Sequence, residues 1–176
     1  MRLKTSPEDF RVRELLEWPE VADGPFVVHK LHKAKLSTTE ALSLLARDAE
    51  LSRIVNLVGP EALSSAQRWE LEGASLIKEA VLQQSALDAA DSYCSPHKQF
   101  ELLELVMQVF DRGRELIAMG APVQELAEHP VLARIRRAKS TWSSDETDQL
   151  AEFAGEVYKA FAALHSEYAS SQEKAS

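Results

Sequence analysis

Few side chains in this sequence stand at a spacing that is typical of catalysis or of ligand binding. His29 and His32 lie three residues apart in a stretch where a strand is expected. On a strand, that spacing puts the two imidazoles on opposite faces, which is poor for one metal ion. The single cysteine, Cys94, excludes an internal disulfide and belongs to no CxxC motif. We therefore expect no metal site, no cofactor and no catalytic residue.

The sequence also lacks the motifs that cradle nucleotide phosphates or activate a nucleophile. None of its six glycines precedes a lysine, so there is no GxxxxGKS/T loop, and GxGxxG, HExxH and GxSxG are absent as well. Polar residues do gather before and after Pro96, namely Asp88, Asp91, Tyr93, Cys94 and His97. Such residues next to a proline are what a helix-capping turn requires, and we favour that interpretation over a polar ligand site.

Charge is distributed unevenly along the chain. The formal net charge is −8, yet residues 1–47 hold eight Lys/Arg against seven Asp/Glu, which leaves twelve against twenty-one for residues 48–176. The one basic stretch, HKLHKAK, carries three lysines that we interpret as charges discouraging strand pairing at a sheet edge, in preference to phosphate contacts. An acidic chain offers no broad basic surface to contact a phosphate backbone, so RNA binding is not expected.

Neither end of the chain predicts a membrane segment. No run of eighteen apolar residues is present, and the start MRLKTSPEDF turns polar where a signal peptide is apolar. We therefore expect a cytoplasmic location without direct insertion into a membrane. The last residues, 171–176, are expected to fray.

Two kinds of element must position these residues. Phe10 and Val12, followed by the apolar stretch 26–31, predict two short strands joined by a loop with two prolines and a glycine. From Ser37, whose STTE motif forms a capping box with Glu40, the apolar spacing becomes that of helices. The predicted fold class is α+β and predominantly α: a C-terminal bundle of about five helices with a small N-terminal strand pair.

Local start and stop signals delimit the helices. The first predicted helix has an apolar stripe that reaches Val58 and is ended by Gly59-Pro60. The later signals are a cap at Ser64 or Ser65, a start at Ser95-Pro96, an end at Gly120, a short helix between Pro122 and Pro130, and a start at SSDETDQL. Aromatic residues at helical spacing are interpreted as core: Trp69, Phe100, Phe110, Phe153, Tyr158 and Phe161.

Three long stretches stand out within about residues 44–170, namely LLARDAELSRIVNLVGPEALS, VLQQSALDAADSYCSPHKQFELLELV and MGAPVQEL. In order and spacing they resemble the C-terminal helical domain of the catalytic A subunit of V/A-type rotary ATPases. The resemblance implies a domain that lies below the nucleotide-binding domain and bears on the central stalk. Implied partners are therefore rotary ATPase subunits, namely the central stalk and the neighbouring A and B subunits.

Two groups of residues acquire expected roles from this resemblance. It implies that one segment approaches the adenine end of the bound nucleotide, namely Gln83, Gln84, Ser85, Ala86 and Leu87. The family usually has Phe where Val81 and Leu87 stand and Asn where Ser85 stands, so base stacking is expected to be weak. The second group is the acidic start of the last predicted helix, which could meet a basic stalk surface or remain a solvated face: Asp145, Glu146, Asp148, Glu152 and Glu156.

Two further stretches lie within residues 1–46, MRLKTSPEDFRVRELLE and GPFVVHKLHKAKLSTTEAL. They resemble a different family, the N-terminus of TruD-type tRNA pseudouridine synthases. Catalysis in that family uses an Asp within a Gly-x-Lys-Asp context, and the sequence has no Lys-Asp dipeptide. We therefore expect a non-catalytic fragment or fusion, in which a synthase-like segment over 1–46 continues through one helix into an A-subunit-like domain over 47–170. The alternative function is that of an inactive fragment of an RNA-modifying enzyme.

Overall fold

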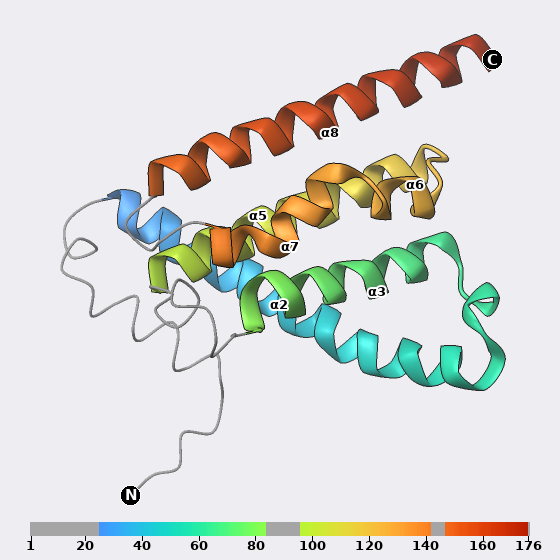
Figure 1. Ribbon diagram of the computed structural model, residues 1–176, viewed down its shortest axis with the longest axis horizontal. Helices are drawn as coiled ribbons and strands as arrows, with labels where there is room; N and C mark the ends of the chain where they lie inside the picture. The colour runs from blue at the N-terminus through green and yellow to red at the C-terminus, as the bar shows by residue number, and fades with distance from the viewer. Residues whose placement is uncertain (1–24, 84–95, 142–146, 176) are drawn as a thin grey trace, which may run out of the picture.

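The structure is a computed structural model that describes residues 25–83, 96–141 and 147–175. Within these ranges every regular element is a helix (Figure 1). The prediction of a predominantly helical bundle is therefore confirmed. Across the same ranges, no helix is both long enough and apolar enough to cross a membrane.

Helix α2 (Pro25–Val58) contains the residues that were expected to form the second strand. The strand predicted for residues 26–31 is therefore wrong, and the first predicted strand, near Phe10, lies outside the described residues. Pro25 occupies the first helical position, where its fixed φ suits a helix, and the lysine, leucine and alanine residues that follow are good helix formers. Ser37 consequently lies inside the helix, where it is buried, and does not cap its start.

A tight connection joins α2 to the next helix. Gly59 ends α2 with φ +89°, a conformation that favours glycine, and the short 3₁₀ turn η2 (Pro60–Ala62) follows. Helix α3 (Ser65–Ile77) begins with a capping box in which the Ser64 hydroxyl accepts from the Gln67 amide and the Gln67 side chain accepts from the Ser64 amide. The predicted end of the first helix and the predicted serine cap are both confirmed, and the two helices form a hairpin (Figure 1).

Helix α5 (Pro96–Ala118) lies at the centre of the fold. It packs against α3 on one side and against the last helix on another. Its buried residues occupy most of its circumference: Leu102, Leu103, Leu105, Val106, Met107, Val109, Phe110 and Leu116. The core of the protein is therefore built around α5.

Three more helices complete the bundle: α6 (Val123–Ala127), α7 (Pro130–Thr141) and α8 (Thr147–Ala175). The short helix predicted between Pro122 and Pro130 is α6, and Pro130 starts the next helix, α7. Helix α8 lies on the opposite side of the molecule from the α2–α3 hairpin (Figure 1), and its buried stripe comprises Leu150, Phe153, Val157 and Phe161. The helix continues through Ala175, and so includes most of the segment that was expected to fray.

The aromatic residues behave largely as predicted. Four of the six are buried, namely Trp69, Phe110, Phe153 and Phe161, whereas Phe100 and Tyr158 are partly exposed. The indole Nε1 of Trp69 donates a hydrogen bond to the Phe110 carbonyl oxygen at 2.8 Å, which joins α3 to α5. This bond gives the indole N–H, the one polar group of the side chain, a hydrogen-bond partner that burial would otherwise remove.

Candidate interaction sites

The segment expected near a nucleotide begins at the end of an unusual turn. Helix α3 passes into a π-helical turn, η3 (Lys78–Leu82), and the Gln83 amide closes it by donating to the Lys78 carbonyl oxygen at 2.7 Å. Gln83 is extended in backbone and exposed. The rest of the expected segment, from Gln84 through Ser85 and Ala86 to Leu87, lies outside the described residues.

Ion pairs hold η3 from two sides. Lys78 Nζ lies 2.5 Å from Asp48 Oδ2 on α2. Arg136 on α7 pairs with Glu79, with 3.0 Å between Nε and Oε2, and also contacts Glu72 on α3. The side chains of Arg136 and Glu72 are only 24% and 20% exposed, so solvent screens this contact less than it screens a fully exposed pair. Two helices that are distant in sequence therefore meet the same short turn.

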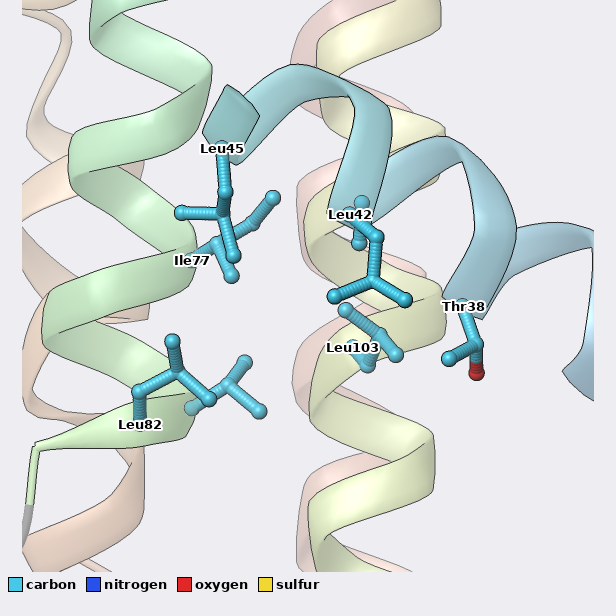
Figure 2. A pocket seen from close by; sticks show the side chains of 8 residues that line it. Thr38, Leu42, Leu45, Ile77, Leu82 and Leu103 are labelled. Atoms are coloured by element: carbon cyan, nitrogen blue, oxygen red, sulfur yellow. The ribbon is translucent and has the colours of Figure 1, made fainter. Parts of the chain in front are cut away.

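An apolar cavity of about 130 Å³ opens beside this turn, between α2, η3 and α5. It is lined by Thr38, Ala41, Leu42, Leu45, Ile77, Val81, Leu82 and Leu103. Figure 2 shows leucine and isoleucine side chains from α2, α3, η3 and α5 turned toward the same space. Thr38 supplies the one hydroxyl of this lining, so the walls suit an apolar group and offer little to a nucleotide.

The acidic residues expected to contact a stalk are only partly described. Asp145 and Glu146 lie outside the described residues, and Asp148 is in the first turn of α8. Glu152 and Glu156 are exposed, and Glu156 pairs with Arg134 of α7 at 2.7 Å. Part of this acidic surface is therefore already neutralised by the basic helix α7. These residues and Gln83 lie on different elements.

An exposed apolar pair at the tip of the α2–α3 hairpin was not anticipated. Leu57 is 84% exposed and Val58 is 66% exposed, whereas the apolar stripe of the sequence had placed Val58 in the core. Both residues lie in the last turn of α2, and the helix ends directly after them at Gly59. That position at the helix end was the available signal. We call Leu57 and Val58 the hairpin tip.

The described residues form no metal site. No group of three or more His, Cys, Asp or Glu side chains in these ranges is arranged to hold an ion. Of the polar residues around Pro96, His97 is described: its Nδ1 lies 3.4 Å from Glu101 Oε1 within the first turns of α5. The others, Asp88, Asp91, Tyr93 and Cys94, lie outside the described residues.

Comparison with known proteins gives these features a context. A family model described as the C-terminal domain of V and A type ATP synthase matches residues 32–126, which is more than half of the chain. The chain belongs to this family. The matched range contains the hairpin tip, the cavity and η3, but ends before α7 begins.

Similarity to individual proteins agrees with the family. The chain is 57% identical over 130 residues to the V-type ATP synthase alpha chain of Nitrosococcus oceani, covering 74% of this chain and 22% of that protein. It is 36% identical over 125 residues to the A subunit of the A-type ATP synthase of Methanopyrus kandleri, covering 71% and 21%. The corresponding protein of Thermococcus onnurineus is 35% identical over 128 residues, covering 73% and 21%. The chain thus spans about a fifth of the length of these relatives.

The expected resemblance to the C-terminal helical domain of the A subunit of V/A-type ATPases is therefore confirmed, and it begins earlier than expected. The family match starts at residue 32, inside the segment 1–46 that was expected to resemble a pseudouridine synthase. Because α2 is continuous from Pro25, the matched region starts within a helix and not at a loop.

Proposed function

We propose that this chain is a non-catalytic fragment or fusion that acts as the helical C-terminal module of a rotary V/A-type ATPase A subunit. In that family, as the resemblance implies, the module couples ATP hydrolysis or synthesis to the central stalk and to proton or sodium transport. We place it in the cytoplasm, at the periphery of a membrane-bound complex, with the stalk and neighbouring subunits as its partners.

The observation that carries this proposal is the hairpin tip. Leu57 and Val58 are exposed at the end of a hairpin whose two helices are joined by an ion pair between Arg47 and Glu70 at 2.9 Å. Ile54 and Val55, one turn earlier, are partly exposed and extend the apolar surface. A contiguous apolar surface on a rigid projection is typical of a protein contact.

The acidic start of α8 is a second proposed contact with the stalk. Glu152 is exposed, and Glu156 is exposed although it pairs with Arg134. A contact made by these carboxylates depends on charge and should weaken with salt, whereas an apolar contact at the hairpin tip should not. Salt dependence therefore separates the two surfaces.

A pull-down with the rotor shaft subunits at low and moderate salt tests the proposal. We expect retention of the wild-type chain, and loss of retention at both salt concentrations for the double variant Leu57→Ser, Val58→Ser. Leu82→Ser is the matched control, because Leu82 is also an exposed leucine, at 46%, but lies at the other end of the hairpin. Glu152→Gln should reduce retention at low salt only. No retention of the wild-type chain at either salt concentration would contradict the proposed function.

A further inference from the structure

The π-helical form of η3 calls for a physical cause. Gln83 N–H bonds to the carbonyl oxygen five residues earlier, on Lys78, whereas in an α-helix it would bond to Glu79. Turns of this type are rare, are less favourable than α-helical turns and occur frequently at functional sites. The described chain shows neither a proline nor a glycine inside η3 that would force the wider winding.

Two consecutive residues of the turn are held by two different helices. Lys78 pairs with Asp48 on α2, and Glu79 pairs with Arg136 on α7. Glu79 also accepts a hydrogen bond from the Ser75 hydroxyl, one turn earlier on α3. The winding of this turn sets the directions in which the two side chains leave the helix axis, and in the π-helical form both reach a partner.

The far end of the turn has room to move. Ala80 and Val81 are buried, but Leu82 is 46% exposed and borders the apolar cavity between α2, η3 and α5 (Figure 2). Close packing therefore does not fix the last residue of the turn. A change of winding could be absorbed by movement of Leu82 into this space.

We propose that Asp48 and Arg136 select the π-helical form of η3, and that losing these ion pairs lets the turn rewind to an α-helix. Rewinding moves the point at which Gln83 leaves the bundle by about one residue, or roughly 1.5 Å along the axis. The functional meaning rests on the proposed function, because Gln83 opens the segment assigned to the nucleotide side. Helix α7, which lies beyond the matched range 32–126, would then set the position at which Gln83 leaves the bundle.

Nuclear magnetic resonance on the full chain can observe the deciding hydrogen bond directly. Scalar coupling through the hydrogen bond should link the amide nitrogen of Gln83 to the carbonyl carbon of Lys78 in the wild type. In the double variant Asp48→Asn, Arg136→Met, we expect loss of that coupling and a new coupling from Gln83 to Glu79. Arg136→Lys, which keeps the positive charge, should retain the wild-type coupling.

Arg134→Met is the matched control. Arg134 lies on the same helix and forms an ion pair at 2.7 Å, but its partner Glu156 is on α8 and not on η3. This variant should leave the Gln83 to Lys78 coupling unchanged. Should the double variant unfold, the single changes Asp48→Asn and Glu79→Gln each remove one ion pair, and an unchanged coupling in both would overturn the proposal. Neither a nucleotide nor a stalk protein takes part, so failure here is distinct from failure of the proposed function.

Discussion

Gly113 sets how closely α3 and α5 approach each other. A Cβ atom at this position would overlap the indole ring of Trp69, whose side chain is fully buried. Alanine suits a helix better than glycine by about 1 kcal/mol, but inserting a methyl group into a packed core costs about 1–3 kcal/mol. We expect Gly113→Ala to lower the free energy of unfolding by about 1–2 kcal/mol in denaturant titration.

Gly155 provides the opposite case for the same change. It lies in α8, and a Cβ atom there would meet nothing within 4 Å. Gly155→Ala should therefore raise the free energy of unfolding by up to about 1 kcal/mol, through helix propensity alone. Equal effects from the two substitutions would show that the Trp69 contact does not limit the approach of the helices.

Tyr168 makes the stability of the α6–α8 contact depend on alkaline pH. Its hydroxyl donates to Glu125 Oε2 at 2.7 Å. That hydrogen bond, together with desolvation and nearby carboxylates, raises the pKa of Tyr168 from 10.0 to about 12. Because the folded pKa lies above the unfolded one, this stabilisation is fully present below pH 10 and is lost as the pH rises toward about 12.

We expect Tyr168→Phe to be less stable than the wild type at neutral pH and the difference to shrink between pH 10 and about 12. Denaturant unfolding of both proteins across that range measures the effect. Ultraviolet titration provides an independent readout, since one of the three tyrosines should ionise later than an ordinary phenol. A constant difference between the two proteins across the range would exclude this linkage.

At the scale of elements, the start of α3 depends on its capping box. The Ser64 hydroxyl accepts from the Gln67 amide at 3.3 Å, so Ser64→Ala leaves an amide of the first turn without this partner. We expect a loss of about 1 kcal/mol in the free energy of unfolding. Ser65→Ala is the control, because Ser65 is exposed at the first helical position and does not cap; its effect should be close to zero.

Helix ends were predictable because their signals are local. Gly59, Ser64 and Pro130 each act through their own backbone or through residues within one turn, and each stands at a boundary in the structure. The beginning of α2 was not predictable in the same way. A short apolar stretch such as 26–31 fits both a strand and a helix, and the residues after it in the chain decide between them.

The candidate sites were less accessible to sequence reasoning than the helices. Arg136 and Glu79 are far apart in sequence, and no local sequence pattern predicts that α7 contacts η3. The resemblance pointed to Gln83 but could not reveal that a π-turn precedes it. The exposure of Leu57 and Val58 was readable in principle, because the two residues directly precede the glycine that ends α2.

For the molecule as a whole, we expect no binding of ATP or ADP tighter than about millimolar. Val81 is aliphatic and buried, so it cannot stack on a base. One stacking contact contributes about 1–3 kcal/mol even with an aromatic side chain, while millimolar affinity needs roughly 4 kcal/mol. Isothermal titration calorimetry checks this, and a micromolar constant for the chain alone would reveal a binding site that these residues do not account for.

The unbroken course of α2 limits how this chain can be altered or could have been assembled. Leu44 and Leu51 are both buried and lie seven residues apart, which is close to two full turns. Each residue advances a helix by about 100°, so one inserted or deleted residue between them would rotate everything upstream away from its present neighbours. A junction between two sequences inside this helix therefore preserves the packing of the bundle only if it keeps the rotation of the upstream residues about the helix axis. A junction that adds or removes a single codon would change that rotation by about 100°.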